Sequence, residues 1–80
     1  MKKILRFTAS WCSPCKVLAK NLELAQIGVP IEVVDIDVFP EVAEDYQVRS
    51  VPTLIMLENS HELKRLIGVQ PVQAIEAWAK

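Results

Sequence analysis

Hydrophobic and polar residues recur along the chain with two periods, one typical of strands and one typical of helices. Residues 3–8, Lys-Ile-Leu-Arg-Phe-Thr, are rich in apolar and β-favouring types and predict a strand. Over residues 14–27 the apolar residues recur at helical spacing, and Gly28 and Pro30 then mark the end of this predicted helix. The apolar residues at this spacing are Leu18, Leu22 and Ala25.

The second half of the chain predicts shorter elements of the same kinds. A run rich in β-branched residues, 31–36, predicts a strand parallel to the first, because a full helix connects the two. Pro40 opens a predicted helix over 40–47, and a nearly unbroken apolar strand follows at 53–57. Residues 62–67 predict a last strand antiparallel to it, and Pro71 begins a final helix. The residues predicted to pack inward from these two helices are Val42, Ala43 and Tyr46, then Val72, Ile75 and Trp78.

The order of these elements, βαβαββα, predicts an α/β fold with one four-stranded mixed sheet and helices on both faces. Eighty residues leave room for one hydrophobic core, so we expect residues 1–80 to form a single domain. Hydrophobic residues make up 51% of the chain and charged residues 24%, as is typical of soluble globular proteins.

Charge and hydropathy exclude several classes of partner and location. The formal net charge is −1, with acidic and basic residues interspersed, which gives no electrostatic reason to expect nucleic acid or an anionic membrane. No apolar run approaches the roughly 18–20 residues that cross a bilayer. Arg6 interrupts the apolar stretch near the N-terminus, which argues against a signal peptide, and we expect a cytoplasmic protein.

The chain contains two cysteines, Cys12 and Cys15, only three positions apart. A secreted domain of this size usually carries several disulfides, and two clustered cysteines close a loop too short to connect distant segments. A structural zinc site normally needs four nitrogen or sulfur ligands, whereas the chain adds only His61, which follows a predicted turn and is expected at the surface. The cysteine pair therefore indicates chemistry rather than structure or metal binding.

The cysteines lie in the segment Trp-Cys-Ser-Pro-Cys-Lys, residues 11–16, between the first predicted strand and helix. Unpaired backbone N–H groups and the positive end of the helix dipole face Cys12 there, and both favour the thiolate, the attacking species. Cys15 lies one turn into the helix, near enough to attack a mixed disulfide on Cys12. Pro14 stiffens the turn, and Lys16 adds positive charge while it points to solvent.

Residues 11–16 resemble the active site of the thioredoxin family, whose usual form has Gly in place of Ser13. Residues 50–53, Ser-Val-Pro-Thr, are similar to the family's loop with a cis-proline opposite the cysteines. Further matches in the family's order are Ile36-Asp37, Pro40, Tyr46, Arg49 and Gly68. The resemblance runs from about residue 3 to the C-terminus and implies a minimal thioredoxin-like fold.

The resemblance implies a thiol–disulfide oxidoreductase that reduces protein disulfides through a mixed disulfide, in which Cys12 attacks and Cys15 resolves. The supporting residues it implies are Trp11, Ser13, Pro14, Lys16 and Pro52. The substrate-binding surface it implies consists of Trp11, Val51, Pro52, Gly68 and Val69. The expected partners are disulfide-containing target proteins and a thioredoxin reductase-type flavoprotein as electron donor, and the protein is expected to act as a monomer without a bound cofactor.

Two departures from the family pattern change the expected mechanism. The sequence does not show the N-terminal strand and helix of full-length thioredoxins, which leaves a glutaredoxin-sized core. Arg6 stands where the family has a buried Asp, and Val33 stands where the family has the Lys that pairs with it. A guanidinium cannot act as a base, so we expect its stem to cover the sheet while its head reaches solvent or an acidic neighbour, Asp35 or Asp37. Proton removal from Cys15 then falls to water or to the leaving thiolate.

Other functions on the same scaffold remain open from the sequence. A glutaredoxin typically carries Cys-Pro-Tyr-Cys and a Gly-Gly stretch for glutathione, whereas here Gly68 is followed by Val69. A redoxin dedicated to ribonucleotide reductase is compatible with the same motif. A redox-inactive binding module usually lacks one of the two cysteines, and an oxidase or isomerase of an oxidising compartment needs a targeting segment.

Overall fold

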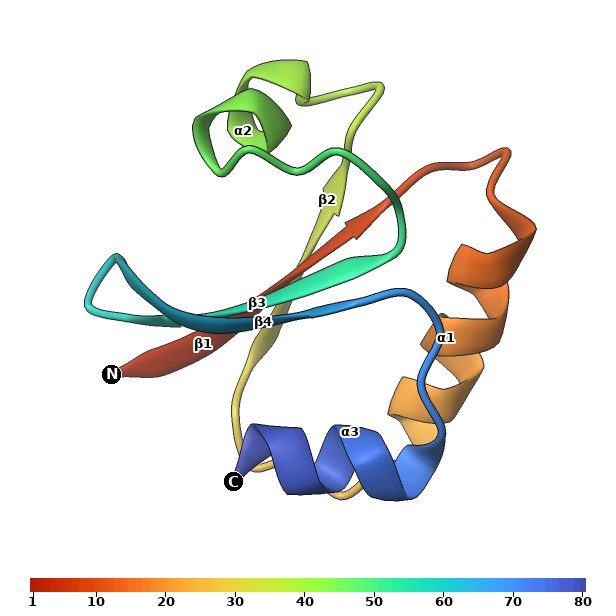
Figure 1. Cartoon of the computed structure of the whole chain (residues 1–80), viewed down its shortest axis with the longest axis vertical. Helices are drawn as coiled ribbons and strands as arrows, with labels where there is room; N and C mark the ends of the chain where they lie inside the picture. The colour runs from red at the N-terminus through yellow and green to blue at the C-terminus, as the bar shows by residue number, and fades with distance from the viewer.

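Four strands and three helices follow one another in the predicted order βαβαββα in the computed structural model, which describes residues 1–80 (Figure 1). The elements are β1 (Lys2–Thr8), α1 (Ser13–Leu24), β2 (Ile31–Asp35), α2 (Pro40–Asp45), β3 (Thr53–Glu58), β4 (His61–Ile67) and α3 (Val72–Ala79). Every strand begins and ends within one residue of its predicted range.

The four strands form one mixed sheet in the order β2-β1-β3-β4. β1 is parallel to β2 and antiparallel to β3, and β4 is antiparallel to β3. The connection from β1 to β2 runs through α1, which is why these two strands can be parallel. The predicted fold class is therefore confirmed.

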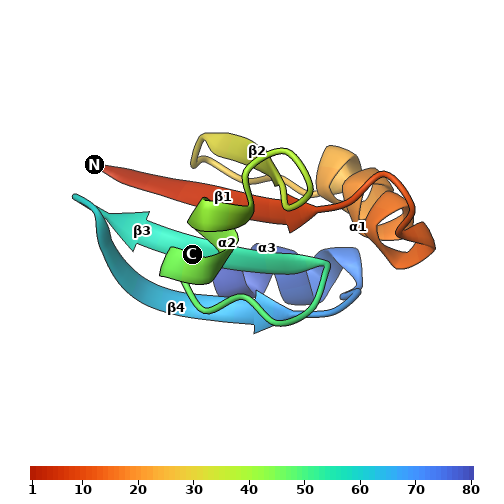
Figure 2. The same ribbon diagram turned by 90° about the horizontal axis from the view of Figure 1, so that it is seen from above.

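Helices cover both faces of the sheet. Figure 1 shows α2 above the sheet and α3 below it, and Figure 2 shows α2 in front of the strands, α3 behind them and α1 to the right, beyond the strand ends. The core on the side of α1 and α3 consists of Ile4, Leu18, Leu22, Leu54, Met56 and Ile75, and the core under α2 of Leu5, Phe7, Val34, Ala43, Ile55 and Leu57. The residues predicted to pack inward from α2 and α3 pack against these cores, except Val72, which is partly buried but belongs to neither core.

Helix α1 ends at Leu24, three residues earlier than predicted. Ala25 takes an extended backbone conformation, and its N–H bonds to the carbonyl of Asn21. Ile27 continued the apolar spacing of the helix, but it packs against the core from the loop that follows. Glu76 of α3 accepts a hydrogen bond of 2.8 Å from the backbone N–H of Gln26 in this loop. The apolar spacing thus continues past the helix because the loop also faces the core.

Helix α2 is also shorter than predicted and ends at Asp45, since Gln47 takes a left-handed conformation with φ of 54°.

The longest helix, α1, has 12 residues. None of the three helices combines the length and the apolar character that spanning a bilayer requires.

One edge of the sheet gathers the segments that carry the sequence motifs. Thr8 at the end of β1 pairs with Asp35 at the end of β2. Thr53 at the start of β3 pairs with Phe7 of β1 on one side and with Ile67, the last residue of β4, on the other. The cysteine motif, the proline loop and the glycine after β4 therefore leave the sheet at the same end.

Candidate active site

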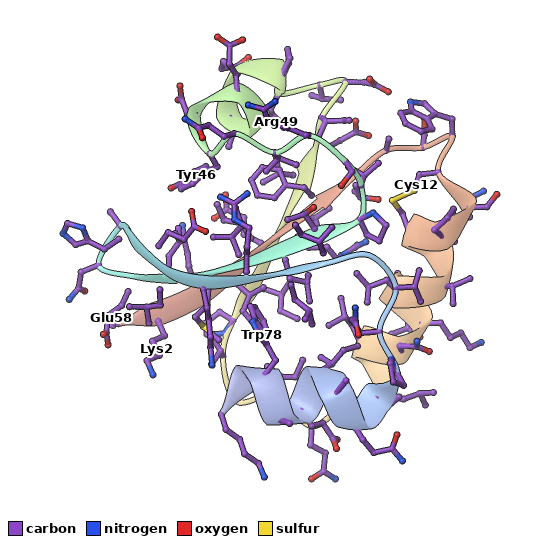
Figure 3. All side chains as sticks on the ribbon, viewed as in Figure 1. Lys2, Cys12, Tyr46, Arg49, Glu58 and Trp78 are labelled. Carbon is purple, nitrogen blue, oxygen red and sulfur yellow. A yellow bond between two sulfur atoms is a disulfide. The ribbon has the colours of Figure 1, made fainter.

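Cys12 is the N-cap residue of α1, and its sulfur lies at the amino end of the helix (Figure 3). The Cys12 Sγ accepts a hydrogen bond of 3.1 Å from the backbone N–H of Cys15. The two cysteines are joined by a disulfide, with their Cα atoms 5.3 Å apart. Pro14 occupies the first turn, where its missing N–H costs no hydrogen bond. The sequence motif therefore forms the local structure that its spacing predicts.

Both sulfurs are more enclosed than a reactive surface cysteine would suggest. Cys12 is 4% exposed and Cys15 1% exposed in the disulfide form. Ala9 packs with them in a small apolar cluster, and Ile36 and Val51 lie against it. Access to the disulfide is therefore limited to the small exposed part of Cys12.

The loop before β3 covers this part of Cys12. The Val51–Pro52 peptide bond is cis, as expected, and Pro52 is buried. The carbonyl oxygen of Val51 lies 3.8 Å from Cys12 Sγ. Thr53 fixes the loop by donating a hydrogen bond of 2.8 Å from its hydroxyl to the carbonyl of Ser50. The proline loop and the cysteine motif, 39 residues apart in sequence, are therefore direct neighbours.

The turn after β4 joins the same surface. Gly68 donates a backbone hydrogen bond of 2.9 Å to the carbonyl of Pro52. Its φ of 86° lies in the left-handed region, which glycine adopts without strain. Asn21 of α1 donates a hydrogen bond of 2.9 Å to the carbonyl of Gln70, which ties this turn to the helix that carries the cysteines. Val69, between Gly68 and Gln70 in this turn, is 40% exposed.

Trp11 lies beside Cys12 with 66% of its surface exposed. Its indole Nε1 donates a hydrogen bond of 2.9 Å to Asp37 Oδ2, just after β2. The backbone N–H of Asp37 in turn donates to Asp35 Oδ1 at 2.9 Å. Asp37 is a site residue that sequence reasoning missed in this role, although it belongs to one of the matched motifs.

Ser13, Pro14 and Lys16 are exposed around the cysteines, so Lys16 points to solvent as expected. No group of three or more His, Cys, Asp and Glu side chains is close enough to hold a metal ion.

Arg6 was expected to cover the sheet with its stem and to direct its head to solvent or to an acidic neighbour. Its side chain is half-buried, but it forms no ion pair, since the two ion pairs of the chain are Lys3–Glu32 and Arg65–Glu62. Of the two expected alternatives, solvent or an acidic neighbour, the acidic neighbour is not found: Asp37 bonds to Trp11, and Asp35 lies beyond ion-pair distance. Burial lowers the pKa of the Arg6 guanidinium from its ordinary value.

Comparison with known proteins agrees with this geometry. The family model for thioredoxin matches residues 1–80. The chain belongs to the thioredoxin family. It is 41% identical to a thioredoxin of Chlamydia trachomatis over 70 residues, covering 84% of this chain and 69% of that protein. It is 37% identical to a thioredoxin of Mycolicibacterium smegmatis over 78 residues, covering 90% and 70%.

Solved structures show the same likeness. A mutant thioredoxin of Halobacterium salinarum superposes with a TM-score of 0.89 at 28% identity, covering 98% of this chain and 71% of that one. A thioredoxin of Fasciola hepatica gives 0.84 at 30% identity, covering 99% and 81%. Together with the Cys12–Cys15 disulfide, family membership identifies the chain as a thiol–disulfide oxidoreductase that reduces protein disulfides.

Proposed function

We propose that Cys12 is the attacking thiol and Cys15 the resolving thiol of this protein-disulfide reductase. The main support is that the two sulfurs differ in their hydrogen bonding. The N–H of Cys15 points at Cys12 Sγ at 3.1 Å, and no backbone N–H donates to Cys15 Sγ. An N–H hydrogen bond and the helix dipole both favour a thiolate on Cys12. Cys12 also keeps the larger exposed fraction of the two, 4% against 1%.

The proposed reaction begins with the dithiol form. The Cys12 thiolate attacks one sulfur of a partner's disulfide, a bond forms between Cys12 and that sulfur, and the partner's other sulfur leaves as a thiolate and takes up a proton. Cys15 then loses its proton and attacks Cys12 Sγ, which releases the partner's remaining thiolate. The partner gains two electrons and is reduced, and the protein ends as the observed Cys12–Cys15 disulfide.

The proposed docking surface consists of Trp11, Val51, Pro52, Gly68 and Val69. Support comes from the contacts that hold these segments around Cys12: the Val51 carbonyl 3.8 Å from Cys12 Sγ and the bond between Gly68 and Pro52. Trp11 and Val69 supply exposed apolar area at its two sides. An extended substrate segment can pair with the backbone of Val51, as in β-strand addition.

The electron donor, the target proteins, the compartment and the monomeric state are also part of the proposal. The oxidised protein requires a dithiol donor, which by family membership is a thioredoxin reductase-type flavoprotein. One similar solved structure concerns the thiol-resolving mechanism of a yeast mitochondrial peroxiredoxin through glutathione and thioredoxin systems, and it is 28% identical to this chain with a TM-score of 0.86. Disulfide-containing proteins of a reducing compartment are therefore the proposed targets, with a cytoplasmic, monomeric protein as the carrier.

Trapping experiments test the two roles. Cys15→Ser is expected to accumulate mixed disulfides with target proteins, because the attack occurs and resolution does not. Cys12→Ser is the matched control, which differs by the same atom substitution at the other cysteine, and it is expected to trap few. The assignment is reversed if Cys12→Ser traps more protein, or if Cys15 alkylates faster than Cys12 near neutral pH.

A further inference from the structure

A pocket of about 270 Å³ lies behind the disulfide, between α1 and the strands β1 and β2. Its lining includes Arg6 from β1, Cys15 and Lys16 from α1, and Asp35 from β2. It contains none of the proposed docking residues, so substrate does not need to fill it. The pocket brings a half-buried cation and the more buried sulfur of the active site to one solvent-filled space.

The charge of Arg6 is not neutralised inside the protein. Arg65, the other partly buried arginine, bonds to Glu62 through two nitrogens, at 2.6 and 2.7 Å, and also donates to the carbonyl of Tyr46. Arg6 has no such partner, and its neighbours across the sheet register are the apolar Val33 and Leu54. A guanidinium keeps its proton throughout the physiological range, so a full positive charge remains at this place.

Cys15 is the group that needs such a charge. It must become a thiolate to attack Cys12 Sγ, and at 1% exposure the thiolate is poorly hydrated. The N–H that assists Cys12 is its own backbone group and points away from its sulfur. A cation that faces the same pocket offsets part of the lost hydration.

We propose that Arg6 stabilises the thiolate of the resolving Cys15 across this pocket. The inference relies on the proposed role of Cys15. Arg6 replaces a base with a fixed charge: the Cys15 proton goes to water or to the thiolate leaving the partner, and Arg6 lowers the free energy of the anion left behind. Arg6 touches neither substrate nor Cys12, so it is a positioning residue that acts through Cys15.

Glu23 of α1 shares a second pocket with Arg6, but the two form no ion pair. Three other charged groups lie near the pocket beside Cys15. Lys16 has the same sign as Arg6, but it is exposed and hydrated. Asp35 has the opposite sign and counteracts Arg6, while one of its oxygens accepts the N–H of Asp37. The carboxylate of Asp37 bonds to Trp11. Arg6 and Asp35 therefore make opposite contributions, and the sign of each can be tested separately.

The first test measures Cys15 alone. Cys12→Ser leaves Cys15 as the only thiol, so thiolate absorbance against pH gives its ionisation midpoint whichever cysteine attacks first. Adding Arg6→Leu is expected to raise this midpoint by about one pH unit, the low end of the effect of a neighbouring charge. Arg6→Lys keeps the positive charge and is expected to leave the midpoint close to that of the parent. Asp35→Asn removes a negative charge and is expected to lower the midpoint.

Lys2→Leu is the matched control, because it removes the same charge from the same face of β1, at the far end of the molecule from Cys12 (Figure 3). It is expected to leave the midpoint unchanged. The proposal is overturned if Arg6→Leu leaves the midpoint within about 0.2 units of its parent, or if Lys2→Leu shifts it as far. Arg6→Gln removes the same charge but keeps a polar side chain, should the leucine variant fold poorly, and an unchanged midpoint there also overturns the proposal.

The second test uses the intact dithiol and a small aromatic disulfide in single turnover. Attack by Cys12 releases one coloured thiolate, and resolution by Cys15 releases the second. A rise of one unit reduces the thiolate fraction tenfold but raises its nucleophilicity, so resolution in Arg6→Leu slows about three- to fourfold below the midpoint. Above the midpoint it becomes about threefold faster. Rate profiles that cross in this way support a charge effect, whereas a uniform slowing at every pH contradicts it.

Discussion

Gly68 allows a stability prediction with a control inside the same chain. The chain has two glycines, and a Cβ added at either meets no atom within 4 Å. Gly68 has φ of 86°, whereas Gly28 lies outside the left-handed region. Alanine at the two positions therefore differs in backbone strain and not in steric clash.

The magnitude follows from two opposing terms. Alanine in the left-handed region costs about 1–2 kcal/mol, which applies at Gly68 only. Alanine also restricts the unfolded chain, which stabilises the protein by about 0.4–1 kcal/mol at either position. Gly28→Ala is thus expected to be neutral or slightly stabilising, and Gly68→Ala to be destabilising. Because the unfolded-state term cancels, the two variants differ by about 1–2 kcal/mol in free energy of unfolding.

Urea denaturation of the two oxidised variants measures this difference. With a slope of about 1 kcal/mol/M for a small domain, the midpoints differ by about 1 M or more. Strain at Gly68 also acts on the hydrogen bond from its N–H to Pro52, so the Gly68 variant is expected to lose activity on protein disulfides as well. Equal midpoints for the two variants would refute the reasoning, since the positive φ at position 68 would then have no cost.

Two further predictions concern polar side-chain pairs, the hydrogen bond between Trp11 and Asp37 and the ion pair between Glu62 and Arg65. Asp37→Ala removes the acceptor of Trp11 and is expected to raise KM for a protein disulfide about fivefold, equivalent to about 1 kcal/mol, with turnover of a small aromatic disulfide unchanged. A parallel loss on both substrates would contradict a docking role. Arg65 lowers the pKa of Glu62, so the pair stabilises the protein above the ordinary carboxyl pKa and this contribution is lost as pH falls through the lowered value. Glu62→Gln is expected to be less stable by under about 1 kcal/mol near neutral pH and equally stable in acid, as urea denaturation at both pH values can show.

The fold was predictable because its elements differ sharply in period. Leu54 to Leu57 is an unbroken apolar run and is buried throughout, whereas α1 shows helical spacing because only one of its faces meets the sheet. The end of α1 was not predictable, since Ile27 continues that spacing while it packs from a loop. Helix periodicity reports which residues face the core and not which backbone conformation brings them there.

The candidate site was predictable where its residues are close together in the sequence or match a family motif. Cys12 and Cys15 are three residues apart, so the helix they begin fixes their geometry. The bond between Trp11 and Asp37 joins residues 26 apart, and only the folded register brings their side chains together. The position of Arg6 was predicted as a departure, but the absence of an acidic partner depends on side-chain directions that no pattern contains.

The sheet topology separates two properties of the active site. The proposed docking residues lie just before α1, in the proline loop and just after β4, around the exposed edge of Cys12. Arg6 lies on the face of β1 that meets α1, and it reaches the pocket behind Cys15. In the proposed mechanism, partner choice and the ionisation of the resolving thiol therefore depend on different residues, because Arg6 lines the pocket beside Cys15 and none of the docking residues does. Substitutions at Trp11 or Val69 are expected to change which disulfides bind, while substitutions at Arg6 are expected to change how fast a bound partner is released.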